Sequence, residues 1–256
     1  MIRLLVPVFI LFSFFVRDEK PTLYLIGDST VKAGQGNGGN GMWGWGSVIN
    51  QLFDTGKINV ENHAIGGRSS RTFLTDGRWE PLLEKMNDGD YLIIQFGHND
   101  DWALNDTIRA RGTIDGIGEE FEEIDNLLTH KHEVVHSFGW YLRKYVNEAK
   151  AKGVEVFICS PIPFNRYDGE GLIPRKPDFY PVWASQVAEQ TETHFINLHE
   201  MTAQVYDKLG YEIVKKAYFT DKDDVHTNRQ GAHLNAGHVV KGVEETDSSL
   251  KNFLKP

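Results

Sequence analysis

The sequence predicts a three-layer α/β domain with helices on both faces of a parallel sheet, and three observations support this fold class. Short apolar runs alternate along the chain with segments of helical periodicity. Three of the runs, over residues 22–26, 91–96 and 154–158, are apolar at most positions, which is typical of strands that are buried on both faces. The chain has 256 residues, of which 40% are hydrophobic, so it can bury a substantial core.

The apolar runs supply the strands of this sheet. Because helical segments separate them, we expect parallel strands joined by right-handed crossovers. The candidate strands are Thr22–Ile26, Ile58–Asn62, Tyr91–Phe96, Val154–Ile158 and His194–Leu198.

The helical segments are recognised by apolar residues spaced three and four positions apart. This spacing occurs in residues 45–53, where Trp45 is expected in the core, and in residues 134–149. The last helix is expected to open at Thr227, with Gln230 three residues later completing a capping box.

Two long segments interrupt this alternation and are expected as loops. Residues 100–132 are charged and contain glycine, and residues 161–181 are rich in proline. Long loops inside a compact domain are usually functional or mobile. We expect a single domain over residues 20–256.

Residues 1–19 are interpreted as a signal peptide or N-terminal hydrophobic segment. Arg3 precedes an apolar run over residues 4–16 that is too short to span a bilayer comfortably. No small-x-small triplet precedes Arg17, so an uncleaved anchor is the alternative; otherwise no stable membrane partner is expected. The expected location is the periplasm or the extracellular space. Cys159 is the only cysteine, so no internal disulfide is predicted.

Unusual polar and glycine residues follow the predicted strands. In open parallel sheets, ligands bind beyond the carboxyl ends of the strands, so these residues are expected to share one place. The segments are Gly27–Thr30, Asn62–Arg71, Gly97–Asp100 and, before the last helix, Asp223–His226.

Together these segments contain the groups that acyl transfer requires. A serine hydroxyl becomes a good nucleophile when an imidazole removes its proton, and the imidazole needs a carboxylate on its other nitrogen. A tetrahedral intermediate needs donors aimed at its oxyanion, which the Ser29 amide, a glycine amide and the Asn99 side chain could supply. Each segment alone also fits a turn, a helix cap or a solvated loop. Their joint occurrence at strand ends favours catalysis.

The motifs GDST, Gly-Gly-Arg, GHND and DxxH resemble the four blocks of the SGNH (GDSL) hydrolase superfamily. Within it, GDST, NHAIGGRSSRTF, FGHND and HTNRQGA are similar to the rhamnogalacturonan acetylesterase family. The resemblance runs from about Thr22 into the final helix. It implies a flavodoxin-like, doubly wound α/β/α fold of about five strands, and ester hydrolysis without a metal or other cofactor. The implied partner is an acetylated pectic polysaccharide or oligosaccharide.

The resemblance also implies roles for individual residues. Ser29 corresponds to the nucleophile, His226 to the base and Asp223 to its partner, while Gly67 and Asn99 join the Ser29 amide as oxyanion donors. Two assignments stay open by one residue, because Gly66 precedes Gly67 and Asp224 follows Asp223. The insertion over residues 101–132 is longer than in compact fungal members. The Gly-x-Ser-x-Gly elbow of α/β-hydrolases is absent, which disfavours that superfamily.

The formal net charge of −9 disfavours nonspecific nucleic-acid binding. It also disfavours a polyanionic substrate unless basic residues gather locally. Arg68 and Arg71, with neighbouring arginines, either form internal salt bridges or face galacturonate carboxylates. Trp102 is the candidate wall or platform for a sugar. We therefore list Arg68, Arg71 and Trp102 as candidate substrate-binding residues.

Two other functions compete with this interpretation. Residues 132–136 read HEVVH, which matches the zinc-protease pattern HExxH. On the predicted helix, His132 and His136 lie away from the apolar face, and no third ligand is identified, so a chance match is favoured and no metal is expected. The runner-up enzyme is an SGNH esterase acting on another acetylated glycan or on lipid-like esters. A catalytically silent glycan-binding protein is the alternative of a different class.

Overall fold

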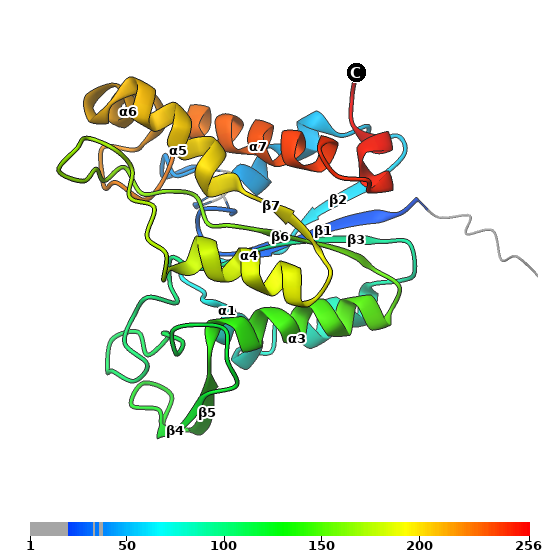
Figure 1. The fold of residues 1–256 in the computed structure, drawn as a ribbon. Coiled ribbons are helices and arrows are strands. Elements are labelled where there is room, and N and C mark those ends of the chain that lie inside the picture. Colours follow the sequence, from blue (N-terminus) through cyan, green and yellow to red (C-terminus); the bar gives the residue numbers. More distant parts are fainter. Residues whose placement is uncertain (1–19, 33, 36–37) are drawn as a thin grey trace, which may run out of the picture.

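The computed structural model describes residues 20–32, 34–35 and 38–256, so the predicted signal segment 1–19 lies outside the described residues. Its centre is a five-stranded parallel sheet in the order β2-β1-β3-β6-β7 (Figure 1). This is the 2-1-3-4-5 order of flavodoxin-like sheets, and all five predicted strands are confirmed. The strands are β1 Thr22–Gly27, β2 Asn59–Asn62, β3 Tyr91–Gln95, β6 Glu155–Cys159 and β7 His194–Ile196.

Successive side chains of the central strands point into two different cores. In β1, Leu23 and Leu25 pack into one core, whereas Tyr24 and Ile26 pack into the other. Because side chains alternate across a strand, a strand covered on both faces must be apolar throughout. This is why these strands appear in the sequence as continuous apolar runs.

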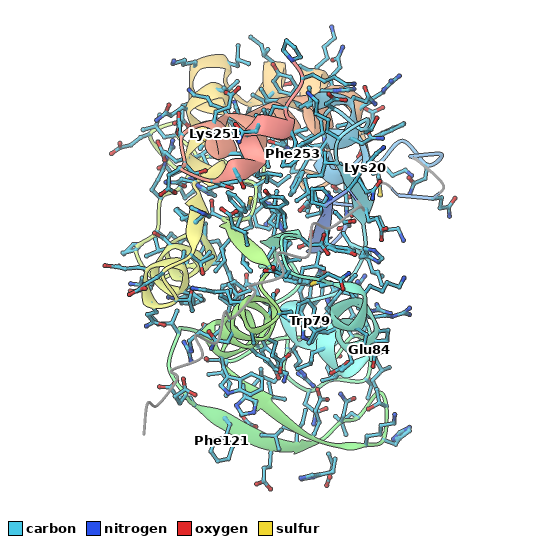
Figure 2. All side chains as sticks on the ribbon, turned by 90° about the vertical axis from the view of Figure 1, so that its right-hand side faces the viewer. Lys20, Trp79, Glu84, Phe121, Lys251 and Phe253 are labelled. Carbon is cyan, nitrogen blue, oxygen red and sulfur yellow. The ribbon has the colours of Figure 1, made fainter. Side chains whose placement is uncertain are left out.

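Helices form the two outer layers (Figure 1). One layer contains the helices that carry much of the first core: α1 Ser70–Thr75, α2 Trp79–Lys85, α3 Phe138–Ala151 and α4 Tyr180–Gln190. The opposite layer contains η1 Trp45–Ser47, η2 Ile49–Leu52, α5 Leu198–Leu209, α6 Tyr211–Tyr218, α7 Arg229–Glu244 and η3 Ser249–Phe253. Figure 2 shows Trp79 and Phe253 on these two sides of the sheet.

A two-stranded antiparallel hairpin projects from the first layer, beyond α3 (Figure 1). It consists of β4 Phe121–Asp125, which lies within the predicted long loop, and β5 His132–His136, which begins at the last residue of that loop. The expectation of a helix from residue 134 is therefore wrong. Helix α3 begins at Phe138, because the Ser137 side chain caps it by accepting a hydrogen bond from the Trp140 amide.

Two further helix predictions need correction. Residues 45–52 form two short 3₁₀ helices, although Trp45 is fully buried as expected. The predicted capping box at Thr227 and Gln230 is also wrong. Asn228 caps α7 by accepting from the Gly231 amide, while the Thr227 hydroxyl donates to the Trp43 carbonyl.

None of the helices in the described part of the chain combines the length and the apolar character needed to cross a membrane.

Candidate active site

The candidate nucleophile stands in a tight turn at the carboxyl end of β1. The Asp28 carbonyl accepts hydrogen bonds from the Val31 and Lys32 amides, which reverses the chain directly after the strand. The Asp28 side chain accepts from both the amide and the hydroxyl of Thr30, which fixes the turn from the inside. Between them Ser29 is left partly exposed. The strand ends at Gly-Asp-Ser because this sequence builds the turn.

The structure brings Ser29, His226 and Asp223 together. The Ser29 hydroxyl lies 3.0 Å from His226 Nε2, although 197 positions separate the two residues in the sequence. The other ring nitrogen, Nδ1, lies 2.8 Å from Asp223 Oδ2. Asp223 Oδ1 accepts from the amides of Val225, at 2.9 Å, and His226, at 2.7 Å. A nucleophile, a base and an orienting carboxylate therefore stand in hydrogen-bonded order.

The two adjacent aspartates contact different basic side chains. Burial alone would raise the pKa of Asp223, but hydrogen bonds from the amide and ring of His226 and from the Val225 amide hold that pKa below its usual value. Asp223 is therefore a stable anion beside the imidazole. The Asp224 carboxylate instead lies 3.1 Å from Lys215 Nζ, and the same ammonium donates to the Asp223 carbonyl. The geometry places Asp223, and not Asp224, on His226.

Potential oxyanion donors surround Ser29. Gly67 has a φ of +78°, which favours glycine, and its neighbour Gly66 is so close that an added Cβ would lie 3.7 Å from Ser29 Cβ. Within the described part of the chain, the amides of Ser29, Gly66 and Gly67 have no acceptor. The Asn99 side-chain nitrogen donates to the Arg68 carbonyl at 2.9 Å and has a second hydrogen to give. Both glycines thus remain candidates.

A buried polar network supports the turn from below. Asp28 is fully buried and contacts His98 Nδ1 at 3.3 Å, while His98 Nε2 lies 3.0 Å from the Ile162 carbonyl. Burial opposes ionisation of Asp28, but His98 and Thr30 hold its pKa below the usual value. Gln95 donates to the Thr30 hydroxyl at 2.6 Å and accepts from the Trp45 indole. The sequence alone indicated no role for these residues, although Asp28 belongs to the GDST motif and His98 to the GHND motif.

A second buried group lies beside the oxyanion donors. Asp100 is fully buried and accepts hydrogen bonds from the amide and hydroxyl of Ser70. Burial raises the pKa of Asp100 to about 7. Arg111 donates to the Gly67 carbonyl at 3.0 Å, and its guanidinium packs over the Trp102 ring. Arg111 therefore holds the Gly67 peptide in place.

The three candidate substrate-binding residues have different surroundings. Arg71 is fully buried, and its guanidinium binds Glu133 in a bidentate pair while donating to the carbonyls of Leu104 and Gly112. Because the Arg71 side chain is not accessible to a substrate, its assignment as a substrate-binding residue is wrong. Arg68 is partly exposed and pairs with Asp76 at 2.5 Å.

Trp102 remains accessible, with 47% of its surface exposed. It lines a shallow hollow with Asp101 and Phe121 and supports Arg109 and Arg111 by cation–π contacts. Its position is compatible with contact to a ligand, but the contacts visible here are to these two arginines.

The HEVVH segment does not have the geometry of a zinc-protease helix. Because residues 132–136 form a strand, the two histidines stand about 14 Å apart along the chain, against about 6 Å on a helix. Glu133 is bound to Arg71, and the His136 ring stacks on Trp140 at 3.8 Å. In the described residues no group of three or more His, Cys, Asp or Glu side chains is arranged to hold a metal.

Comparison with known proteins agrees with the fold and the motifs. The profile of the GDSL-like Lipase/Acylhydrolase family matches residues 25–234. A rhamnogalacturonan acetylesterase of Emericella nidulans is 29% identical over 233 residues, which cover 91% of this chain and 89% of that protein. The rhamnogalacturonan acetylesterase RhgT of Bacillus subtilis is 30% identical over 249 residues, which cover 92% and 95%.

Solved structures share the same fold. The crystal structure of the Bacillus subtilis protein YxiM superposes with a TM-score of 0.70 at 25% identity, covering 88% of this chain and 56% of that one. An acetylxylan esterase from Geobacillus stearothermophilus, Axe2, gives a TM-score of 0.60 at 18% identity, covering 88% and 95%.

Together with the motifs at the strand ends, the family match and the named relatives show that the chain is a carboxylic ester hydrolase. The chain belongs to the GDSL-like lipase/acylhydrolase family. The resemblance to rhamnogalacturonan acetylesterases seen in the sequence is thereby confirmed.

Proposed function

We propose that this protein removes acetyl groups from pectic rhamnogalacturonan through a Ser29–His226–Asp223 triad and an acetyl-enzyme. The observation that carries the catalytic part is the continuous contact from the Ser29 hydroxyl through the His226 ring to the Asp223 carboxylate, beside amides that have no other acceptor. The relatives named for this activity support the substrate part.

In the acylation step, His226 Nε2 removes the proton from Ser29 as its oxygen bonds to the acetyl carbonyl carbon. Asp223 stabilises the imidazolium that forms. The negative charge that develops on the acetyl oxygen is stabilised by the amide of Ser29, a glycine amide and the second hydrogen of Asn99 Nδ2. His226 then protonates the sugar hydroxyl as the C–O bond breaks.

In the deacylation step, water enters as the sugar leaves. His226 removes a proton from this water, whose oxygen attacks the acetyl carbonyl carbon of the Ser29 ester. The same donors stabilise the second tetrahedral intermediate. Its collapse releases acetate, and His226 returns the proton to the Ser29 oxygen.

The decisive experiment compares wild type with Ser29→Ala on a panel of acetylated pectins, acetylated xylans and a small aryl acetate. Wild type should release acetate fastest from rhamnogalacturonan, and Ser29→Ala should lose several orders of magnitude in rate while its thermal stability is retained. Turnover by Ser29→Ala at the wild-type rate would overturn the mechanism.

The panel also separates the remaining functions. Faster deacetylation of xylan at equal acetyl concentration would replace the pectic substrate by another glycan and keep the esterase mechanism. Axe2, named as an acetylxylan esterase, makes that second substrate worth testing, although its likeness to this chain concerns the fold. Failure to hydrolyse even the aryl acetate would support a silent glycan-binding protein.

We further propose that the protein is exported. The support is the sequence of the first 19 residues, with Arg3 before an apolar run. Expression of the full chain followed by N-terminal sequencing of the secreted and cell-bound fractions tests this. Product that stays inside the cell with an intact Met1 would contradict it.

A further inference from the structure

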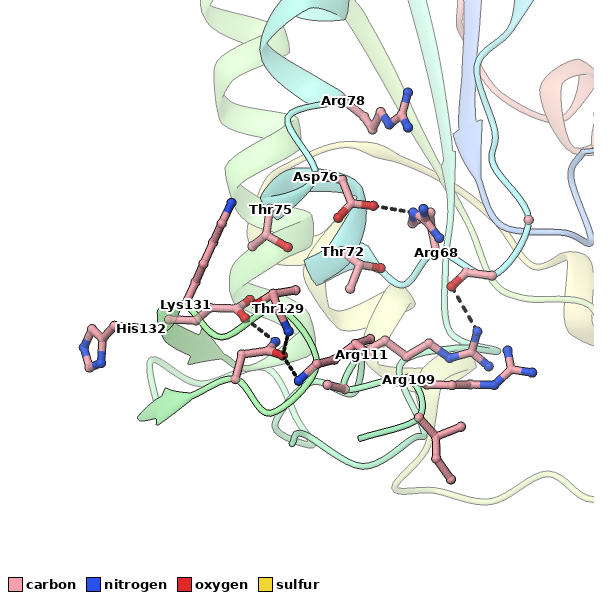
Figure 3. Close-up of a pocket in the computed structure, with 17 residues that line it drawn as sticks. Arg68, Thr72, Thr75, Asp76, Arg78, Arg109, Arg111, Thr129, Lys131 and His132 are labelled. Carbon is pink, nitrogen blue, oxygen red and sulfur yellow. Dashed lines mark hydrogen bonds and ion pairs between the residues drawn. The ribbon is translucent and has the colours of Figure 1, made fainter. Parts of the chain in front are cut away.

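A groove of about 1020 Å³ begins at the two glycines beside Ser29 and continues to the β4–β5 hairpin (Figure 3). Its lining includes Gly66 and Gly67, which lie beside Ser29, and Lys131 and Glu133, which belong to the hairpin. This volume lies at the top of the range of about 300–1,000 Å³ that is typical of small-molecule sites, so the groove can hold several linked sugar units.

The acidic side chains that line this groove are already paired. Among the described residues of its lining, Asp76 binds Arg68 at 2.5 Å and Glu133 binds the buried Arg71 at 2.7 Å. Their negative charge is therefore neutralised within the protein.

Besides Arg111, three cations in the lining have no acidic partner in the described part of the chain: Arg78, Arg109 and Lys131. All three are exposed, and Figure 3 shows them reaching the groove from the loop before α2, the insertion and the hairpin. In a chain with 36 acidic and 27 basic residues, three unpaired cations along one groove create a local positive field.

Arg111 also lines this groove. It is buried at the side of the groove, and its Nη1 donates to the Gly67 carbonyl. Burial, and next the nearby charge of Arg109, lower the pKa of Arg111 to about 10. The Arg111 guanidinium places a positive charge next to Gly67 through this hydrogen bond.

We propose that this groove binds the carboxylate groups of an acidic polysaccharide on one side of the acetylated sugar, with Arg78, Arg109 and Lys131 as its specificity-determining residues. This inference rests on the proposed esterase function. It adds the orientation of the bound polysaccharide, which would extend from Ser29 towards the hairpin. The cations are spread along the groove, which suits carboxylates repeated along a chain better than one compact anion. Threonine side chains between them, including Thr72 and Thr129, offer hydroxyl groups to the sugars.

The test replaces the three cations by glutamine, singly and together: Arg78→Gln, Arg109→Gln and Lys131→Gln. The matched control is Lys57→Gln with Lys241→Gln and Lys251→Gln, which removes the same charge outside the groove. Substrates are an acetylated uronate-containing oligosaccharide, the same oligosaccharide with its carboxyl groups reduced, and an aryl acetate.

For the groove triple variant we expect KM for the uronate substrate to rise about tenfold or more at low salt, with kcat little changed, since each exposed contact contributes modestly. Added salt should shrink this difference. The aryl acetate, the carboxyl-reduced substrate and the control variant should respond as in wild type. An unchanged KM, or an equal rise with the carboxyl-reduced substrate, would overturn the proposal.

Binding without turnover separates this proposal from the proposed function. Titration calorimetry of Ser29→Ala with unacetylated oligogalacturonide should show binding that the groove substitutions abolish. The oligogalacturonide could bind to the groove while wild type releases no acetate from any acidic glycan. This result would support carboxylate binding in the groove and contradict the proposed substrate. If acetate is released from rhamnogalacturonan and the substitutions change nothing, the groove proposal fails alone.

Discussion

Asp223 and Asp224 are neighbours in the chain, but their carboxylates face different groups. The Asp223 carboxylate is hydrogen-bonded to the His226 ring and to two backbone amides, whereas the Asp224 carboxylate forms an ion pair with Lys215. The sequence left these two residues unresolved because their spacing to His226 differs by one position. The two aspartates are distinguished only by the turn in the folded chain, which brings the Asp223 carboxylate to the His226 ring.

Asp223→Asn is expected to lower kcat by about 10²–10⁴, because an amide stabilises the imidazolium poorly and can select the wrong tautomer. Asp224→Asn is expected to change kcat by less than about tenfold, since it removes a partly exposed ion pair with Lys215. Steady-state rates on an aryl acetate, with melting temperatures of both variants, measure the difference. A large loss at Asp224 with a mild one at Asp223 would move the triad by one residue.

Because its pKa is raised in the folded protein, Asp100 should make the free energy of unfolding depend on pH. Its folded pKa, about 7, lies above the ordinary value of 3.8, so between these values the folded protein binds more protons than the unfolded chain. The contribution of Asp100 to the free energy of unfolding therefore falls as pH rises from about 4 to 7. Asp100→Asn should flatten this part of the profile, because its Oδ1 can still accept from Ser70 while no charge forms.

Urea unfolding of wild type and Asp100→Asn at intervals from pH 4 to 8 gives the comparison. The variant should gain relative stability as pH rises. Parallel profiles across this window would show that Asp100 ionises in the folded protein much as it does in the unfolded chain.

At the scale of elements, the hairpin is attached to the sheet domain through Arg71. This side chain, at the beginning of α1, joins β5 through Glu133 and the insertion through two carbonyls. It thereby connects three segments that border the groove. An arginine that looked like a ligand for substrate carboxylates is in fact satisfied by the protein's own oxygen atoms.

Arg71→Met should lower the free energy of unfolding by about 3 kcal/mol or more, because it leaves the largely buried Glu133 carboxylate and two carbonyls without their donor. Arg175→Met is the matched control, since Arg175 pairs with Glu200 and Asp207 but is about one-third exposed, and it should cost less than about 1 kcal/mol. Urea denaturation measures both, and equal losses would contradict the structural role given to Arg71.

At the scale of the whole molecule, the sequence predicts the parallel sheet and the site at its edge well. The apolar strands β1, β3 and β6 are covered on both faces, and the residues that follow parallel strands converge at one edge of the sheet. The hairpin could not be predicted in this way, because Val134 and Val135 fit a helical and a strand pattern equally. The role of Arg71 depends on Glu133, which stands 62 positions away and enters the site only in the folded chain.

Metal removal tests this assembly as a whole. Incubation with a strong chelator should leave aryl acetate hydrolysis unchanged, because the proposed steps use only side chains and amides and the two histidines of the HEVVH strand cannot share an ion. A substantial loss that zinc reverses would contradict this prediction.

The long separation between Ser29 and His226 has a consequence for synthesis. The serine leaves the ribosome early, but its base follows 197 residues later, and α7, which packs against the η1 segment, comes later still. A nascent chain therefore cannot carry the triad until nearly all of it has emerged. Hydrolysis of an aryl acetate by stalled chains of increasing length would accordingly begin only when the last helix is free to dock, so that ester cleavage would report the completion of folding.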